Sequence, residues 1–262
     1  MRYALITDVG CLSDTTSHPV TISPLPAASI SGTTVVCQNS TAPQITFTGS
    51  IGTAPYTFTY TINGGAPLTV TSTGNTATVS APTAVPGTFT YSLVSVQDAS
   101  PASCSQPQTG SAIVTVNPLP TATISGSTTV CENATSPFIT FTGAVGTAPY
   151  TFSYSINGGP ALTVTTTSGN TVTVPAPTST PGTFIYTLLN VTDGTSTACT
   201  QNQSGSATIT INPLPTATIS GTTEQCENGT GPVVTFTGAV GTAPYTFYYR
   251  INGGPLLNVT GT

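Results

Sequence analysis

The chain has 262 residues, of which only 3% are charged, and its two arginines and seven acids leave a net charge of −5. So few cations cannot neutralise a row of phosphates, and no apolar run approaches the roughly 18 residues of a membrane-spanning helix, which excludes nucleic acid as a partner and a membrane span in this segment. Hydrophobic residues make up 37% and the chain is rich in Val, Thr, Gly and Pro, so the composition predicts an all-β protein with almost no helix.

A ten-residue stretch marks an internal repeat. It reads NPLPTATISG at 117–126, returns unchanged at 212–221 and nearly unchanged at 23–32. The copies begin at 23, 117 and 212, which gives spacings of 94 and 95 residues. This period is too long for a solenoid repeat and fits an independently folded sandwich domain.

The spacing divides the chain into four parts. The first repeat is 23–116, the second repeat is 117–211, and both are complete. Residues 1–22 correspond to the C-terminal strands of a truncated repeat, and 212–262, the third repeat, corresponds to the N-terminal half of another.

Within the second repeat, periodicity predicts seven strands. Tyr150, Phe152, Tyr154 and Ile156 alternate with small polar residues, as a half-buried strand requires, and a hairpin signal, Asn157-Gly158, follows them. The other strands are expected at 121–125, 138–142, 183–191 and 206–212, around Leu162 and Val164, and around Val172 and Val174. Seven short strands in about 95 residues predict an all-β immunoglobulin-like sandwich for each complete repeat.

Each repeat begins with a Pro-Leu-Pro joint. A proline fixes its own φ and restricts the residue before it, so these joints should have little slack. We therefore predict tandem domains arranged end to end as a rod. The joint prolines are Pro24 and Pro26, Pro118 and Pro120, and Pro213 and Pro215.

Six cysteines at repeating positions, without metal-ligand spacing, indicate disulfides and an oxidising, extracellular location at the cell surface. Cys37, Cys131 and Cys226 occupy the first position of a repeat, and Cys11, Cys104 and Cys199 occupy the second.

Two pairing schemes keep the period. One joins the two positions within a repeat, Cys37 with Cys104 and Cys131 with Cys199; the other crosses each joint, Cys11 with Cys37, Cys104 with Cys131 and Cys199 with Cys226. In a straight rod the second scheme separates the sulfur atoms far beyond bonding reach, so we favour the first. The first scheme has a difficulty, because the two positions should lie at opposite ends of a sandwich unless the loop at 193–202 folds back.

No group of residues indicates catalysis, a cofactor or a metal, so the sequence predicts a protein that is not an enzyme. His18 has Ser13 and Asp14 near it in sequence, but a solvated loop histidine is the favoured interpretation. Asp98 and Asp193 recur at one repeat position, where a turn aspartate that bonds its own backbone is favoured over a calcium ligand.

The aromatic residues allow two interpretations. Tyr56, Phe58 and Tyr60 could form a sugar-stacking platform, but their strict alternation favours a core. Tyr248 and Arg250 replace Ser153 and Ser155 on the opposite face, which should point outward. Surface polysaccharide therefore stays a candidate partner, beside neighbouring repeats of the same or identical chains.

The runs NPLPTATISG, TVCENAT, FTGAVGTAPYTFSYSINGG and GTFIYTLLNVTD together resemble the immunoglobulin- or PKD-like repeats of very large surface proteins of gliding Bacteroidota, such as the SprB-type gliding adhesins. The resemblance covers essentially the whole chain. It implies export by the type IX secretion system and display as long surface structures.

These observations favour a structural stalk segment of a repetitive adhesin or fibre, used for surface attachment or gliding. One alternative is a filament subunit that assembles head to tail by strand complementation. The other is a set of spacer repeats in a secreted polysaccharide-active protein.

Overall fold

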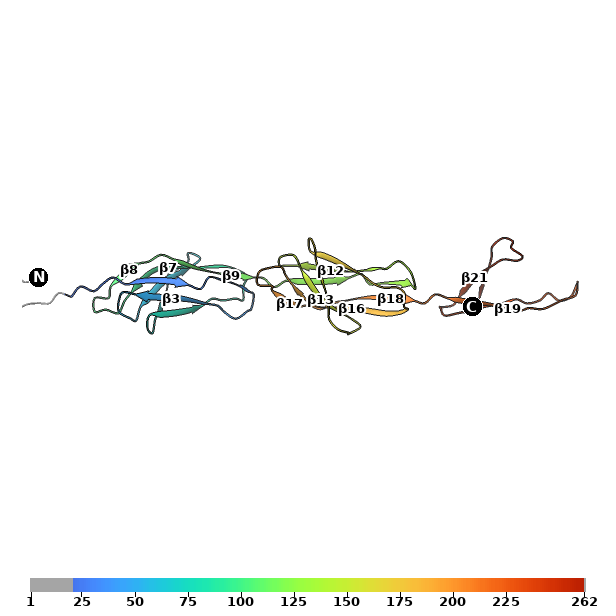
Figure 1. Ribbon diagram of the computed structural model, residues 1–262, viewed down its shortest axis with the longest axis horizontal. Coiled ribbons are helices and arrows are strands. Elements are labelled where there is room, and N and C mark those ends of the chain that lie inside the picture. Colours follow the sequence, from blue (N-terminus) through green and yellow to red (C-terminus); the bar gives the residue numbers. More distant parts are fainter. Residues whose placement is uncertain (1–20, 262) are drawn as a thin grey trace, which may run out of the picture. The chain divides into compact units, whose positions relative to one another are not determined.

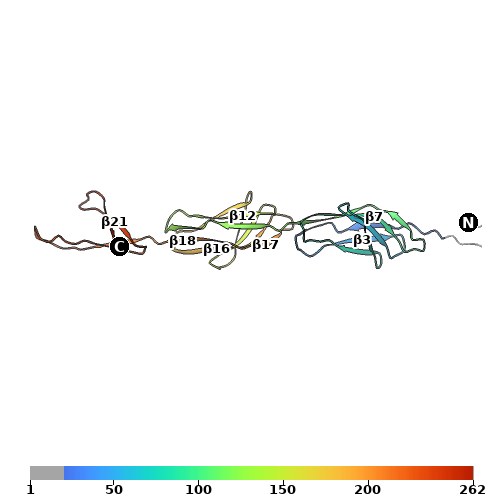
Figure 2. The same ribbon diagram turned by 180° about the vertical axis from the view of Figure 1, so that it is seen from behind.

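The computed structural model describes residues 21–261, and all the regular structure in that range is β-strand. The chain divides into two compact units, Met1–Pro118 and Leu119–Thr262. Figure 1 and its reverse view, Figure 2, show the strands of each unit in sequence colours. None of residues 21–261 belongs to a helix with the length and apolarity that crossing a bilayer needs. His18 and Cys11 lie outside the described residues.

The first repeat contains two packed sheets. One has the strand order β1-β3-β6; the other has the order β2-β9-β7-β4-β5, with β8 paired to β7. The strands are β1 (Ala27–Ser31), β2 (Thr34–Cys37), β3 (Gln44–Ser50), β4 (Thr57–Ile62), β5 (Leu68–Thr71), β6 (Thr76–Ser80), β7 (Gly87–Gln97), β8 (Ser105–Pro107) and β9 (Ser111–Asn117). All pairs are antiparallel except β2 with β9, which is parallel.

Alternation along the strands builds the core between these sheets. Phe47 on β3, Phe58 on β4 and Tyr91 on β7 are fully buried, as is Val114 on β9. Because successive side chains of a strand point to opposite faces, each strand contributes every second residue to this core. The two complete repeats are immunoglobulin-like β-sandwiches, as predicted.

The second repeat has the same nine strands. Its sheets have the orders β10-β12-β15 and β11-β18-β16-β13-β14, with β17 paired to β16. The strands are β10 (Thr121–Ser125), β11 (Thr128–Cys131), β12 (Phe138–Ala144), β13 (Thr151–Ile156), β14 (Leu162–Thr165), β15 (Thr171–Pro175), β16 (Gly182–Thr192), β17 (Thr200–Asn202) and β18 (Ser206–Asn212). Phe141, Phe152 and Tyr186 occupy the core positions that Phe47, Phe58 and Tyr91 hold in the first repeat.

Each complete repeat has two strands in addition to the seven that the sequence predicts. The first predicted strand continues after Gly32 as β2, which leaves the sheet of β1 and joins β9 in the other sheet. Gly32 has a φ of +119°, and a Cβ there would lie 2.6 Å from the backbone oxygen of Gln44. Only glycine therefore allows this crossing. The other addition is β17, which lies in the loop at 193–202 where no strand pattern was found.

The third repeat contains four strands in two separate pairs. They are β19 (Thr216–Ser220) with β20 (Thr235–Ala239), and β21 (Tyr245–Tyr249) with β22 (Leu257–Gly261). These strands match β10, β12, β13 and β14 of the second repeat in sequence. No described strand of the third repeat corresponds to β16 or β18.

Candidate functional site

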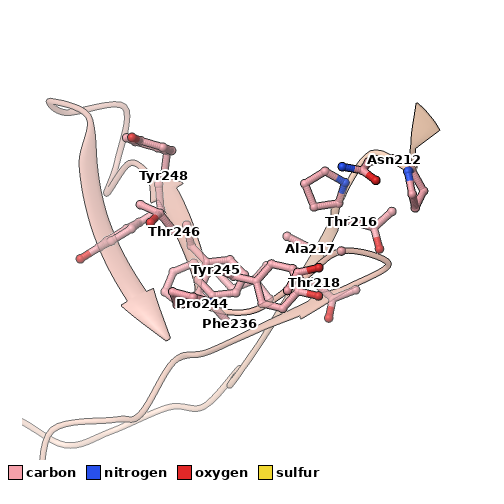
Figure 3. Close-up of a pocket in the computed structure, with 16 residues that line it drawn as sticks. Asn212, Thr216, Ala217, Thr218, Phe236, Pro244, Tyr245, Thr246 and Tyr248 are labelled. Atoms are coloured by element: carbon pink, nitrogen blue, oxygen red, sulfur yellow. The ribbon is translucent and has the colours of Figure 1, made fainter. Parts of the chain in front are cut away.

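A groove with a volume of about 830 Å³ lies in the third repeat, between its two strand pairs (Figure 3). Its walls come from β19, β20, β21 and the Pro-Leu-Pro joint. Tyr245 projects toward Ala217 and Thr218 in the close-up. The lining residues are Asn212, Pro213, Pro215, Thr216, Ala217, Thr218, Ile219, Phe236, Gly241, Thr242, Pro244, Tyr245, Thr246, Phe247, Tyr248 and Tyr249.

The apolar lining of the groove is the core face of a sandwich. Phe236 stacks on Phe247 with ring centroids 5.6 Å apart, the same separation as Phe141 and Phe152 in the second repeat. Phe141 and Phe152 are completely buried, whereas Phe236 is partly exposed and Ile219 is 65% exposed.

The complete repeats show which strands cover this face. In the second repeat, β18 and β16 lie beside β13 in one sheet, and their side chains Tyr186, Leu188, Ile209 and Ile211 belong to the same core cluster as Phe141 and Phe152. The third repeat thus presents an apolar sheet face that two strands of this sequence type cover elsewhere in the same chain. In the second repeat one edge of β13 pairs with β16, whereas the matching edge of β21 has no partner strand among residues 21–261. Added strands pair with such an edge.

The joint prolines differ in their surroundings. Pro26 and Pro120, the second prolines of their joints, are buried in the repeats that they begin, whereas Pro215 is exposed. The first two joints are each followed by a hydrogen bond that the sequence did not indicate. Gln108 Oε1 accepts from the N–H of Ala28 at 3.2 Å, and Gln203 Oε1 accepts from that of Ala122 at 3.1 Å.

These two glutamines tie the first strand of a sandwich to the segment before its last strand. The two glutamines occupy one repeat position, which the sequence shows. Many other polar residues recur in the same way, so this recurrence alone did not identify them as hydrogen-bond partners of the joint. A further bond holds the last joint, where the N–H of Leu214 donates to Glu132 Oε2 at 3.4 Å.

The aromatic triad of the first repeat is a core and not a sugar platform. Tyr56 is 2% exposed, Phe58 is fully buried and Tyr60 is 6% exposed. Tyr248 of the third repeat, which is one of the residues lining the groove, is 66% exposed, as expected. Arg250 is exposed and donates from Nη1 to the carbonyl of Gly254 at 2.7 Å.

Asp98 and Asp193 organise the loop after the longest strand. Asp98 Oδ1 accepts from the Ser100 hydroxyl at 2.8 Å and from the N–H of Cys104 at 2.9 Å, and Oδ2 accepts from the N–H of Thr53 at 3.1 Å. Asp193 Oδ1 likewise accepts from the N–H of Cys199 at 3.0 Å. Both are therefore turn aspartates, and residues 21–261 contain no cluster of three metal-ligating side chains.

The hydrogen-bond donors around the Asp98 carboxyl group determine its charge state. Burial alone would raise the pKa of Asp98, but the hydrogen bonds from Ser100, Thr53 and Cys104 favour the carboxylate and together lower its pKa below the ordinary value. The carboxylate is thus the form that the loop requires.

Acid is expected to weaken the first repeat through Asp98. The folded pKa lies below the unfolded value of about 3.9, so the carboxylate stabilises the fold at higher pH. That contribution declines as the pH falls below about 4 and is lost below the folded pKa. Calorimetry of Asp98→Asn between about pH 2 and 6 should show a shallower acid dependence of the first-repeat transition. Glu227→Gln, at an exposed acid of the third repeat, is the control, and an unchanged slope in Asp98→Asn would contradict this role.

The cysteines do not pair as we favoured from the sequence. Cys37 and Cys199 are disulfide-bonded, whereas Cys104, Cys131 and Cys226 are free thiols. The pairs Cys37–Cys104 and Cys131–Cys199 are therefore not formed.

The reason is the length of the sandwich. Cys131 lies opposite Asn212, near the Gly182 end of β16, and Cys199 adjoins Thr200, which pairs with Thr192 at the other end. A strand of 11 residues spans about 33 Å, whereas a disulfide needs Cα atoms within about 7 Å.

No protein-family model matches the chain, and no curated protein matches it. Among solved structures it is similar to a Ca²⁺-stabilized adhesin with which an Antarctic bacterium binds ice, at 17% identity over 99% of this chain and 79% of that one, with a TM-score of 0.48. A 1.5-MDa bacterial ice-binding adhesin is 19% identical over 90% of this chain and 83% of that one, with a TM-score of 0.43. The fibronectin(III)-like modules of Clostridium thermocellum CbhA are 12% identical over 71% of this chain and 95% of that one, with a TM-score of 0.29. At these identities the likeness concerns the fold alone.

Proposed function

We propose that this chain is a structural shaft segment of a long, repetitive cell-surface adhesin or fibre. The observation that carries the proposal is the repetition of one sandwich with the same core. Phe47, Phe58 and Tyr91 recur as Phe141, Phe152 and Tyr186, and all are buried. Copies of one self-contained domain add length without adding a new site, which is what a shaft requires.

The cellular location and the export route of the proposed shaft are inferred from its cysteines and from the resemblance of its repeats. Cysteines in an oxidised state support an extracellular location. The resemblance to the repeats of gliding Bacteroidota adhesins supports export by type IX secretion and a role in attachment or gliding. As part of this proposal, the repeats at 23–116, 117–211 and 212–262 are the domains of the shaft, and the joints at Pro118 and Pro213 connect them.

The mass of the native covalent chain tests the shaft. Surface proteins sheared from the native cells are separated under reducing, denaturing conditions and detected with an antibody against the second repeat. A shaft predicts a polypeptide far longer than 262 residues. A native species near 26 kDa that polymerises would contradict it.

The groove of the third repeat favours one other candidate function, a filament subunit. Its apolar face would receive the C-terminal strands of a repeat from a second copy of the chain, in place of the cover that β16 and β18 give in the second repeat. Strand addition of this kind would pair the free edge of β21 and bury the exposed Ile219 and the partly exposed Phe236.

A charge placed in the groove tests the filament. Phe247→Asp should abolish concentration-dependent assembly of the purified chain in sedimentation velocity, because a carboxylate would be buried against the incoming strands. Asn258→Asp introduces the same charge on β22 at an exposed residue that does not line the groove, and it should assemble normally. A wild-type chain that stays monomeric at all concentrations would rule out the filament.

A further inference from the structure

One turn has the same pattern in all three repeats. It begins at the first-position cysteine and reads Cys-x-Asn-x-Thr-x-Pro, where no x position holds the same residue in every copy. The copies lie at 37–43, 131–137 and 226–232. Asn-x-Thr, with a middle residue other than proline, is the acceptor motif of N-linked glycosylation. The motif is therefore kept while the residues between its members vary.

The backbone of the turn accounts for an asparagine but does not require this motif. Asn39 and Asn133 have φ values of 60° and 61°, and the N–H of the next residue donates to the carbonyl of the cysteine at 3.1 Å in both repeats. Asparagine tolerates this left-handed conformation. Asn63 and Asn157 in the hairpin turns also have φ values of 50°, but two glycines follow each of them.

The side-chain amides distinguish these two kinds of turn. Asn157 Oδ1 accepts from the N–H of Ile185 at 2.7 Å, and Asn63 makes the matching bond in the first repeat at 2.8 Å. Asn39 and Asn133 are exposed, and their amides have no hydrogen-bond partner in the part of the chain that the structure describes. The fold uses the hairpin amides and leaves the amides of this turn available to solvent.

No contact inside a repeat explains the threonine of the motif. Thr41, Thr135 and Thr230 are exposed, so their methyl groups fill no core. Their hydroxyls make no hydrogen bond to any of the residues that the structure describes. A surface residue of this kind can usually be replaced without loss of stability. A glycosyltransferase, in contrast, requires a hydroxyl two residues after the acceptor asparagine.

We propose that Asn39, Asn133 and Asn228 are N-glycosylation sites. In the reaction, Nδ2 of the asparagine forms a bond to the anomeric carbon of a sugar that is activated as a diphosphate ester. The bond from that carbon to the diphosphate oxygen breaks, the diphosphate ester leaves, and one amide proton passes to a base of the transferase. The step needs no oxidant or reductant. It applies equally to a shaft segment and to a filament subunit.

The turn of each complete repeat lies beside the last residue before a joint. The N–H of Gln38 donates to the carbonyl of Asn117 at 2.8 Å, and the N–H of Glu132 donates to that of Asn212 at 2.8 Å. A glycan on the turn would hydrate a surface with little charge, because only 3% of the chain is charged whereas about 25–35% charged residues favour a soluble surface.

The chain contains three more copies of the motif, which serve as internal controls. They lie in β16, β17 and β22, and none recurs at the same position of another repeat. Their backbones belong to extended, paired strands, so a transferase has less access to them than to a turn. The asparagines of these strand motifs are Asn190, Asn202 and Asn258.

Peptide mapping of the protein sheared from native cells tests the proposal. The protein is reduced, alkylated and digested with chymotrypsin, and electron-transfer fragmentation then identifies the residues that carry carbohydrate. We expect carbohydrate on the three turn asparagines and none on the three strand asparagines. A turn asparagine without carbohydrate, or a strand asparagine modified as fully as the turns, would overturn the proposal.

Variants of the second repeat, produced in the same cells, test the role of the hydroxyl. Thr135→Ala should remove the carbohydrate from Asn133 and leave that on Asn39. Thr135→Ser should keep it, because serine supplies the hydroxyl, and Ala134→Ser in the same turn is the control that should also keep it. Retention of the carbohydrate in Thr135→Ala, or its loss in Thr135→Ser, would contradict recognition through the motif.

Discussion

Replacing Phe152 by alanine is expected to lower the free energy of unfolding of the second repeat by about 3–5 kcal/mol, the usual cost of a large cavity in a core. Phe152 has no exposed surface, stacks on Phe141 at 5.6 Å, and lies between Val164 and Val191 on the neighbouring strands. For a domain of this size the melting temperature should fall by at least about 12 °C. Calorimetry should then separate a lower second-repeat transition from that of the first repeat.

Phe247→Ala is the matched control. Phe247 makes the same 5.6 Å stack with Phe236 in the third repeat, but no described strand of that repeat covers the pair. Its loss should leave the transitions of both complete repeats unchanged. Equal shifts of the second-repeat transition in the two variants would mean that the core completed by β16 and β18 is not what makes Phe152 stabilising.

Most of the fold could be predicted because each strand carries its own alternation. The run with Tyr150, Phe152, Tyr154 and Ile156 and the run from Ser206 to Asn212 have one apolar face each. The first forms β13, which begins one residue after Tyr150, and the second forms β18 with the predicted bounds. The strands that were missed lack this signal. β11 has four residues and no fully buried side chain, and it forms because Gly126 redirects the chain toward β18.

The candidate site was harder to predict than the fold. The alternation of Tyr245, Phe247 and Tyr249 correctly indicates a core face, but alternation does not report whether another strand covers that face. The complete core depends on β16 and β18, which begin 26 and 50 residues after the end of β13 in the second repeat.

The cysteines illustrate the same limit. Their period was plain in the sequence, but their pairing depends on which end of the sandwich each one reaches. That in turn depends on the parallel pairing of β11 with β18, which the sequence did not indicate.

Gly49→Ala is expected to destabilise the first repeat by about 1–3 kcal/mol, although it adds a single methyl group. Gly49 lies on β3, and a Cβ there would lie within 2.8 Å of three ring carbons of Tyr56. Tyr56 is held in place, since it is 2% exposed and its hydroxyl donates to the carbonyl of Gly52 at 2.8 Å. The ring therefore cannot retreat without losing this bond or its packing. Urea unfolding followed by circular dichroism measures the loss.

Gly74→Ala supplies the control in the same repeat, because no atom lies within 4 Å of a Cβ at Gly74 and its φ is ordinary. It should change stability by less than about 0.5 kcal/mol. A double-mutant cycle then assigns the cause. If the clash with the ring is responsible, Gly49→Ala should cost much less in a Tyr56→Leu background, where the side chain is smaller and more flexible, and the coupling should exceed about 0.5 kcal/mol. Additive effects would instead indicate that the contact with the Tyr56 ring is not what makes Gly49→Ala destabilising.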